Sequence, residues 1–431
     1  MLDIQFIREN PDLVQEKSKQ KKVEVNINEL LQLDDRRRQI LAKIEALREQ
    51  RNKLTANLTS KPSAEDIEHG SKLKAEISEL EAQLNPIEND YLSLLKRVPN
   101  MPTDDVPVGA TEEENKVTKI WGNIKDFDFK PKTHWEIGEE KDLIDRERAS
   151  RISGSRFAYL KGAIVEMQFA LINFTMSLLS DERIIERLIK ENNLHISAKP
   201  FIPVLPPVMM RTDAYEATSR LKAEEVTYKL ADDDLWLIGS AEHSMVSMYM
   251  TEILDEADLP IRYLGYSTNF RREAGTYGKD TNGIIRMHHF DKLEMEVFST
   301  PETSFDEHLL LIAIQEHLTQ ELNLPYRVVL KCTADIGDPN ARGVDIEMWM
   351  PGQGTYKETH SADYMTDFQA RDLKTRVRRE NGTIELVHNN DATALAMART
   401  LAAIIENYQT NDGHIIVPER LRPYLGGKEE I

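Results

Sequence analysis

The stretch that decides the fold is NFRREAGTYGKDTNGIIRMHHFDKLEMEVF, residues 269–298. From residue 285 onward apolar and polar side chains alternate, which is typical of a β-strand with one buried face. The apolar positions are Ile285, Met287, Leu293, Met295 and Val297. The positions between them are Arg286, His288, Phe290, Lys292, Glu294 and Glu296. The preceding segment 263–270 predicts a partner strand, which a glycine-rich loop joins to the first.

The polar face of this strand pair has two interpretations. Exposure to water would account well for Lys292 and Glu296. A nucleotide site accounts better for Arg271, Glu273 and Phe290, because an arginine binds phosphate, a ring stacks on a base and a carboxylate accepts from an amine. The pattern by itself leaves both interpretations open.

Other elements follow from the segments around this one. LWLIGSAEHSMV (235–246) predicts a strand that runs into a short helix, and residues 162–180 predict a buried helix. FIPVLPPVMM (201–210) predicts an extended edge segment, since proline cannot donate to a sheet ladder. A closing helix is predicted over about 393–409, with Asp391 as its N-cap.

The first hundred residues carry two coiled-coil seams, in which apolar positions recur at steps of four and three. The seams are Ile40, Ile44, Leu47, Arg51, Leu54 and Leu58, then Leu73, Ile77, Leu80, Leu84, Ile87, Tyr91, Leu94 and Val98. TSKPS (59–63) breaks the helix between them, Ser63 with Asp66 predicts a new N-terminal cap, and Pro86 predicts a kink. The simplest object is an antiparallel hairpin with legs of about 45 Å.

The charge of the chain is uneven. The formal net charge is −19, which excludes a general nucleic-acid coat protein, yet residues 31–61 hold eight basic and four acidic residues. This local excess favours contact with a polyanion, although a purely structural or dimerising hairpin is the simpler alternative. The single cysteine, Cys332, and the charged N-terminus predict a reducing, cytoplasmic location without a signal peptide or membrane span.

The common nucleotide-binding and hydrolase motifs are missing from the sequence. There is no G-x-x-x-x-G-K-[ST] loop, no G-x-G-x-x-G after a strand and no G-x-S-x-G elbow. Use of ATP would therefore need another device, such as an antiparallel sheet that holds phosphates with arginines. His288, His289 and His360 lack zinc-ligand spacing, so a catalytic zinc is not expected.

Segment 345–371 offers hard oxygen ligands instead. Asp345, Glu347 and Glu358 could supply carboxylates, and Glu358 with Ser361 could hold Mg²⁺ beside phosphates. Arg399 lies in the closing helix between small residues that leave room for a ligand.

Several motifs together resemble one family. NFRREAG with IIRMHHFDKLE, and later ALAMARTLAAIIENYQ, resemble the second and third signatures of class II aminoacyl-tRNA synthetases. Features similar to the seryl-tRNA synthetase family are the opening MLDIQFIRENPDLV, the helical hairpin, ISGSRFAYLKG (152–162), MPGQGTYKE (350–358), DFQAR (367–371) and ERLRPYLGG (419–427). The resemblance covers essentially the whole chain.

The resemblance implies an α+β architecture. A tRNA-binding antiparallel coiled-coil arm over 1–100 would be followed by a linker over 101–118. A class II catalytic domain over 119–431 would be built on a mostly antiparallel sheet flanked by helices and would carry the ATP site, the serine site and a dimer interface. Pro207 closes a segment that resembles the first signature, which implies a homodimer.

The resemblance also implies an activity. The chain would activate L-serine with ATP and Mg²⁺ to seryl-adenylate and transfer serine to tRNA-Ser, and transfer to tRNA-Sec stays open. The arm would meet the long variable arm of tRNA-Ser through backbone and shape. The residues of the arm that would contact tRNA are Arg36, Arg37, Arg38, Lys43, Arg48, Arg51 and Lys53.

Individual site residues follow from the same motifs. The serine pocket would use Ser240, Ala241, Glu242, Arg271, Glu294, Asp391 and Thr393. The ATP site would use Arg271, Arg272, Glu273, Arg286, Phe290, Glu358, Thr359, His360, Ser361 and Arg399. Glu358 and Ser361 would also hold the Mg²⁺ ion.

The chain departs from the family pattern near the amino acid. Ser240 stands where threonine is usual, Asp391 where asparagine is usual, and TSRLKAEEVTYKL (218–230) replaces a TGQLPKF-like loop. Residues 359–364 and Asp372 also differ. These changes concern amino-acid selectivity and the order of the 210–230 loop more than ATP use.

Two alternatives to a serine–tRNA ligase remain on the sequence alone. A paralogue that loads another acceptor would not need the arm. A silent RNA-binding or dimeric structural homologue would have no reason to keep Arg271, Glu273, Glu294, Glu358 and Arg399 together.

Overall fold

The computed structural model describes residues 1–56, 63–221, 226–273 and 282–431. The chain forms two compact units, Met1–Met101 and Pro102–Ile431. The predicted linker is therefore largely part of the second unit. Within it, the backbone N–H of Thr103 donates to the carbonyl of Ala341 at 2.9 Å, and Arg342 pairs with Asp105 at 2.8 Å.

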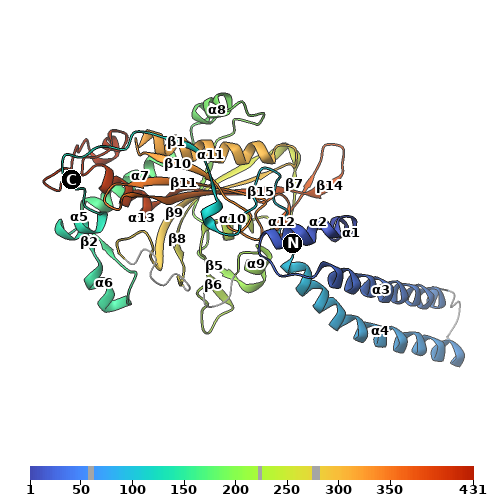
Figure 1. Ribbon diagram of the computed structural model, residues 1–431. Helices are drawn as coiled ribbons and strands as arrows, with labels where there is room; N and C mark the ends of the chain where they lie inside the picture. The colour runs from blue at the N-terminus through green and yellow to red at the C-terminus, as the bar shows by residue number, and fades with distance from the viewer. Residues whose placement is uncertain (57–62, 222–225, 274–281) are drawn as a thin grey trace. The chain divides into compact units, whose positions relative to one another are not determined.

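The first unit is a helical arm. Its helices are α1 (Ile4–Glu9), α2 (Pro11–Gln20), α3 (Ile27–Ala56) and α4 (Ala64–Arg97), and Figure 1 shows α3 and α4 in blue as a long hairpin. Ser63 and Asp66 form the predicted capping box, and Pro86 lies inside α4. Residues 57–62, where Leu58 and the predicted turn fall, lie outside the described residues. The hairpin prediction is confirmed.

Apolar side chains hold the two legs of this hairpin together at two levels. At the base, Ile7 and Val14 from the first helices pack with Leu30 of α3 and with Tyr91 and Leu95 of α4. Further out, a separate buried cluster lies along the predicted seam. It consists of Ile44, Ile77 and Leu84, with Ile40, Leu41, Leu47 and Leu80 against it. The arm therefore has a core of its own.

The second unit is built on one eight-stranded sheet. Its order is β1 (Lys116–Trp121), β10 (Tyr326–Leu330), β11 (Arg342–Met350), β12 (Thr355–Tyr364), β15 (His388–Ala396), β9 (His289–Ser299), β8 (Ile261–Phe270) and β4 (Ile202–Val204). All neighbours are antiparallel except β4 and β8. The edge position of β4 agrees with Pro203, because proline has no backbone N–H to donate to a neighbouring strand.

Helices and short strands surround this sheet. The helices are α5 (His134–Glu140), α6 (Arg146–Ser153), α7 (Ala163–Leu179), α8 (Glu182–Glu191), α9 (Thr212–Ala217), α10 (Ala241–Val246), α11 (Ser304–Glu321), α12 (Phe368–Leu373) and α13 (Met397–Asn407). The 3-10 turns are Glu112–Glu114, Glu256–Asp258 and Glu419–Leu425. Short strands are β2 (Ile144–Asp145), β3 (Tyr159–Leu160), β5 (Met209–Arg211), β6 (Leu235–Leu237), β7 (Ile253–Asp255), β13 (Arg376–Arg378) and β14 (Ile384–Leu386).

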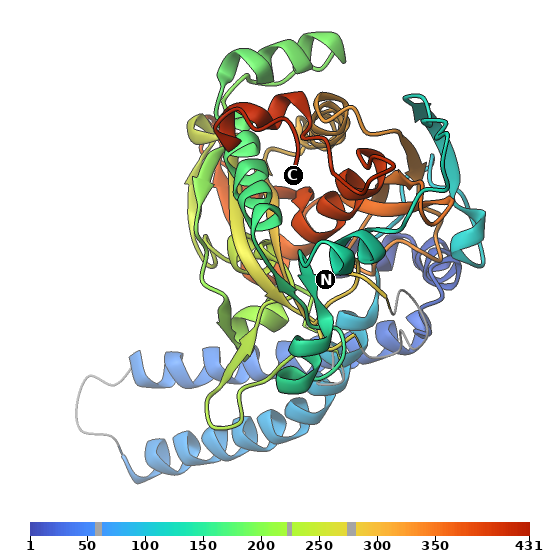
Figure 2. The same cartoon turned by 90° about the vertical axis from the view of Figure 1, so that its left-hand side faces the viewer.

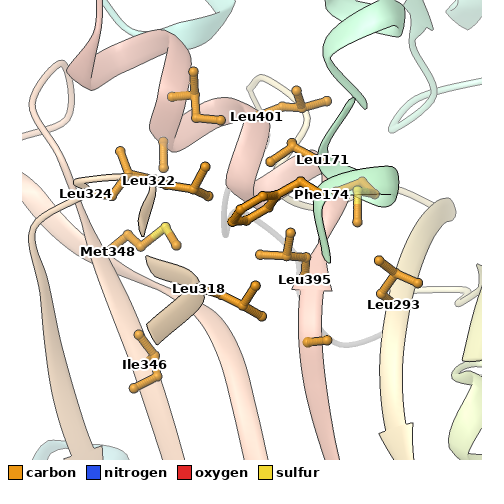
Figure 3. Close-up of a cluster of buried hydrophobic side chains, with 14 of the residues drawn as sticks. Leu171, Phe174, Leu293, Leu318, Leu322, Leu324, Ile346, Met348, Leu395 and Leu401 are labelled. Atoms are coloured by element: carbon orange, nitrogen blue, oxygen red, sulfur yellow. The ribbon is translucent and has the colours of Figure 1, made fainter. Parts of the chain in front are cut away.

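One face of the sheet packs against helices α7, α11 and α13 and forms the main core. In Figure 2 the green helix α7 runs beside the yellow strands of the sheet. Figure 3 shows Leu171 and Phe174 of α7 and Leu401 of α13 facing Leu293, Ile346 and other sheet side chains. Among the described helices, none alone has the length and apolar composition of a membrane span. The consecutive helices α7 and α8 reach that length and composition only when taken together, and they are bent by 72° at their junction.

Strand β9 is buried on both of its faces from Lys292 onward. Leu293, Met295 and Val297 are buried in the core as predicted. Lys292 and Glu296 on the polar face are buried too, so of the two interpretations exposure to water does not hold for them. The opposite face of β9 is covered by α10 and by side chains that line a cavity. Alternation of apolar and polar residues does not show that a second element covers this face.

The predicted N-cap at Asp391 is wrong. Asp391 lies in the middle of β15, opposite Glu296 of β9, and α13 begins only at Met397. Backbone pairing on both sides of β15 keeps this segment extended, and the helix starts where the pairing with β9 ends at Ala396.

A buried ion pair ties β8 to α11 and allows a stability prediction. The Arg262 guanidinium donates two hydrogen bonds of 2.8 Å to the Glu307 carboxylate, and both side chains are fully buried. Glu307→Gln would leave the Arg262 charge uncompensated, so we expect a loss of about 3–5 kcal/mol in unfolding free energy. Urea denaturation followed by circular dichroism measures it.

Glu302→Gln provides the matched control for this substitution. Glu302 pairs with Arg379, but its side chain is 62% exposed, and the loss should stay below about 1 kcal/mol. Equal losses for the two substitutions would show that the burial of the Arg262–Glu307 pair is irrelevant to stability.

Candidate active site

A cavity of about 370 Å³ opens on the face of the sheet opposite the main core. Strands β8, β9, β12 and β15 supply its floor, and α10, α13 and the segment after α9 supply its walls. The predicted residues that line the cavity are Ser240, Glu242, Arg271, Glu273, Arg286, Phe290, Glu294, Glu358, Thr359, Ser361, Asp391, Thr393 and Arg399. The fold thus gathers residues that lie far apart in the sequence.

One end of the cavity carries guanidinium groups and an aromatic ring. Arg271 follows β8, donates from Nε to the carbonyl of Gly239 at 3.1 Å, and lies 5.2 Å from the centre of the Phe290 ring. Arg286 pairs with Glu273 at 2.9 Å, and Arg156 lies 3.8 Å from the same carboxylate. This combination suits the phosphate and the base of a nucleotide.

Arg399 and two oxygen-bearing side chains lie on the part of the cavity formed by α13 and β12. Arg399 of α13 pairs with the Glu358 carboxylate at 3.0 Å and donates to the Glu358 carbonyl at 2.9 Å. Ser361 lies further along β12, opposite Asp345 of β11. Within the part of the chain that is described, no group of three or more His, Cys, Asp or Glu residues is placed to hold a metal ion.

The donor set of this side fits Mg²⁺ better than zinc. Mg²⁺ keeps several waters and usually takes only one or two protein carboxylates together with substrate phosphates. Glu358 and Ser361 offer hard oxygens on the cavity wall and so provide part of such a shell.

The other end of the cavity is rich in carboxylates. Ser240 caps α10 and accepts from the backbone N–H of Glu242, which places Glu242 in the first turn. Burial opposes ionisation of Glu242, but the nearby Arg220 prevails and lowers the pKa of Glu242 to about 2. Burial lowers the pKa of the next residue, His243, to about 3, so its imidazole is neutral at pH 7. Glu242 is therefore a fixed negative charge.

Strands β9 and β15 complete this end. Glu294 is paired with Lys292 and lies opposite Thr393 in the strand register. Burial raises the pKa of Glu294 in spite of Lys292. Burial, together with the Glu242 and Asp363 carboxylates, raises the pKa of Asp391 well above its ordinary value. A ligand that brings a positive charge and hydrogen-bond donors suits these groups.

Three predicted residues do not line the cavity. Ala241 is fully buried in α10, and Arg272 lies over the ring of Tyr228 at 5.5 Å. His360 is buried within the sheet, where its Nδ1 lies 2.9 Å from the Thr359 hydroxyl. The positions of Ala241 and His360 favour roles in packing rather than in ligand contact.

Three charged residues that line the cavity were not among the predicted site residues: Arg220, Lys292 and Asp363. Arg220 reaches carboxylates from three other elements. Lys292 was left open between exposure and a site, and Arg156, which lies beside the site, belongs to a segment quoted only for its resemblance. A basic residue whose partners lie far along the chain leaves no local sequence pattern. The predicted pocket did contain more carboxylates than cations, which could have indicated that a further basic residue lies there.

The seven basic residues predicted to contact tRNA all lie on α3. Arg37 pairs with Glu88 at 3.2 Å, Arg48 with Glu81 at 2.7 Å, and Lys53 with Glu49 at 2.6 Å. Arg38 lies 4.0 Å from Asp35. The remaining three, all exposed and without an ion pair to any described residue, are Arg36, Lys43 and Arg51. These three are the most available for a polyanion.

The sheet and site define the class of protein first. The tRNA synthetase class II core domain (G, H, P, S and T) matches residues 226–408, which contain most of the cavity lining. The core is therefore that of a class II aminoacyl-tRNA synthetase. The seryl-tRNA synthetase N-terminal domain matches residues 1–102, the helical arm.

Full-length relatives identify the family. A serine–tRNA ligase of Syntrophotalea carbinolica is 40% identical over 100% of both chains, and one of Symbiobacterium thermophilum is 41% identical over 98% of both. The crystal structure of seryl-tRNA synthetase from Pyrococcus horikoshii complexed with ATP is similar, with a TM-score of 0.86, 38% identity, and coverage of 100% of this chain and 99% of that one. The chain belongs to the seryl-tRNA synthetase family.

Proposed function

We propose that this chain is a serine–tRNA ligase that forms seryl-adenylate from L-serine and ATP and then transfers serine to tRNA-Ser. The observation that carries the proposal is a single cavity that joins arginines and an aromatic ring at one end to buried carboxylates at the other. Full-length relatives that are named serine–tRNA ligases support it. The arm supports tRNA as the acceptor, and transfer to tRNA-Sec stays open.

The adenylation step needs little covalent work from the protein. An oxygen of the serine carboxylate bonds to the α-phosphorus of ATP, the bond from that phosphorus to the bridging oxygen breaks, and pyrophosphate leaves. The carboxylate is already ionised at pH 7, so no general base is required. Catalysis then consists of holding the reactants in line and stabilising negative charge, roles that suit Arg271 and Arg399.

Other residues would hold ATP in place. Phe290 offers a ring for adenine, and Glu273, fixed by Arg286, offers an acceptor for the adenine amine. Glu358 and Ser361 would hold Mg²⁺, which when bound supplies positive charge beside the phosphates. This protein would thus bind ATP without a glycine-rich phosphate loop.

Serine would bind at the carboxylate end. Glu242, ionised and buried, offers a charge for the substrate ammonium group, and Glu294 with Thr393 offers partners for the side-chain hydroxyl. A pocket that hydrogen-bonds the hydroxyl rejects alanine, because its own buried polar groups would be left unpaired. Close walls must reject the extra methyl group of threonine.

A homodimer is part of the proposal. Phe169 of α7, Ile202 of the edge strand β4, and Leu205 are large apolar residues that are 54%, 54% and 79% exposed. Ile202 and Leu205 lie in the segment that ends at Pro207, the residue for which the resemblance implies a dimer element. A second copy would cover these residues. The cytoplasmic location predicted from the cysteine content remains a prediction.

Amino-acid-dependent ATP–pyrophosphate exchange tests the proposed function. Purified protein with Mg²⁺ would be assayed with serine, threonine, alanine, glycine and cysteine. We expect exchange with serine and a preference over alanine of about 10⁴-fold, as in sites built to bond a substrate hydroxyl. Exchange with another amino acid would make Asp391 and its neighbours determinants of a different specificity. No exchange with any of them would favour a silent RNA-binding homologue.

A further inference from the structure

A guanidinium group from outside the strands enters the carboxylate end of the cavity. Arg220 lies just after α9, and its Nε donates to Oε1 of Glu242 at 2.6 Å. Its Nη2 lies 3.4 Å from Asp363 and 3.6 Å from Asp391. Only 17% of the Arg220 side chain is exposed, against 6% for Glu242 and 7% for Asp391. One cation therefore serves three carboxylates from α10, β12 and β15.

The contacts of Glu242 are one-sided. Arg220 and Gln369, whose Nε2 lies at 3.1 Å, both donate to Oε1. Oε2 lies 3.9 Å from Nε2 of His243, and that ring carries no charge at pH 7. Arg220 and Gln369 thus hold the carboxylate by one oxygen and turn the other toward the cavity, where a substrate ammonium group would lie.

Charge compensation makes the arrangement depend on Arg220. Two or more carboxylates in one buried site oppose one another's ionisation, and each is ionised only where a cation offsets the others. Asp363 and Asp391 are the other two acids of this group, and Asp391, 7% exposed against 14% for Asp363, is the more deeply buried and so the one whose charge most needs a cation. Without Arg220, a proton shared between Asp391 and Glu242 would remove the charge that the ammonium group needs.

We propose that Arg220 is a positioning residue of the amino-acid pocket, which orients Glu242 for the substrate ammonium group and neutralises Asp391, so that Arg220 and Asp391 act as a coupled pair. The inference rests on the proposed function, since it assigns Glu242 to the amine of serine. Arg220 acts through Glu242 and takes no part in the chemical step.

A double-mutant cycle with Arg220→Gln and Asp391→Asn tests the pair. In pyrophosphate exchange we expect Arg220→Gln to raise the KM for serine about 30-fold, because the proton shared by Asp391 and Glu242 would cost the ammonium group one charge-assisted hydrogen bond to Glu242. The KM for ATP should change less than about threefold, because the ATP end of the cavity is untouched. The double variant should return to within about fivefold of the original serine KM, since removing the carboxyl group of Asp391 makes the missing cation unnecessary.

Arg211→Gln is the matched control, because Arg211 lies on β5 before α9 and is 68% exposed. It should leave both KM values unchanged. A serine KM within threefold of the original in a folded Arg220→Gln protein overturns the proposal, as does a double variant no better than the single one. If Arg220→Gln fails to fold, Arg220→Met replaces it, since methionine also lacks the charge, and an unchanged serine KM in that variant likewise overturns the proposal. If the original protein shows no serine-dependent exchange, the proposed function falls, and the assignment of Arg220 falls with it.

Discussion

Arg271→Ala lowers serine-dependent pyrophosphate exchange by at least about 1,000-fold, which corresponds to about 4 kcal/mol of transition-state stabilisation. The reason is position. The Arg271 side chain is anchored by its Nε on the carbonyl of Gly239 and lies over Phe290, so its guanidinium is held beside the ring proposed to bind adenine. Alanine removes a fixed positive charge from the place where the α-phosphate would react. Initial rates of exchange at saturating serine and ATP measure the loss.

The control for this substitution is Arg211→Ala, which removes an exposed arginine outside the cavity and should keep exchange within about twofold. Binding of tRNA by the Arg271→Ala protein, followed by filter retention, should persist because the arm is unchanged. Exchange at a near-original rate would show that Arg271 does not contact the reacting phosphate. Loss of tRNA binding as well would point to a folding defect instead.

The local patterns of the sequence predicted the elements of this site well. Alternation in residues 285–297 predicted β9, and the cap of Ser63 predicted the start of α4, because both patterns depend on near neighbours. The burial of individual strand residues was harder to predict than the strand itself. The burial of Lys292 and Glu296 depends on α10 covering the second face of β9, and that contact crosses many residues of chain.

Two further features could not be read from local patterns. Asp391 precedes a helix and has the residue type of an N-cap, yet pairing with β9 and β12 keeps it extended. Arg220 has partners 22 and 143 residues away, Glu242 and Asp363. Where local propensity allows either a helix cap or a strand, as at Asp391, tertiary contacts of this kind decide which one forms. The family resemblance pointed to residues that line the cavity at both ends, but not to Arg220, which lies in the 218–230 segment where this chain departs from the family pattern.

The arm provides the second large effect, on tRNA rather than on ATP. Three of the predicted tRNA-contact residues make no ion pair with any described residue. They are Arg36, Lys43 and Arg51, seven and eight residues apart on α3, so they share one side of the helix. The chain as a whole is strongly acidic, and a polyanion would be repelled by most of its surface. A row of exposed cations on the arm would therefore carry much of the attraction for a tRNA backbone.

Reversing these three charges (Arg36→Glu, Lys43→Glu and Arg51→Glu together) raises the KM for tRNA at least about 30-fold and lowers the salt dependence of log KM by about two to three, since about three phosphate contacts are lost. Pyrophosphate exchange should stay unchanged, because these residues belong to the arm and not to the cavity. The matched control reverses Arg183, Lys190 and Arg211, which are exposed cations of the second unit, and so changes the net charge equally. If both triple variants weaken charging alike, overall charge governs the encounter and the arm has no special role. If only the arm variant does so, α3 is the surface that receives the tRNA.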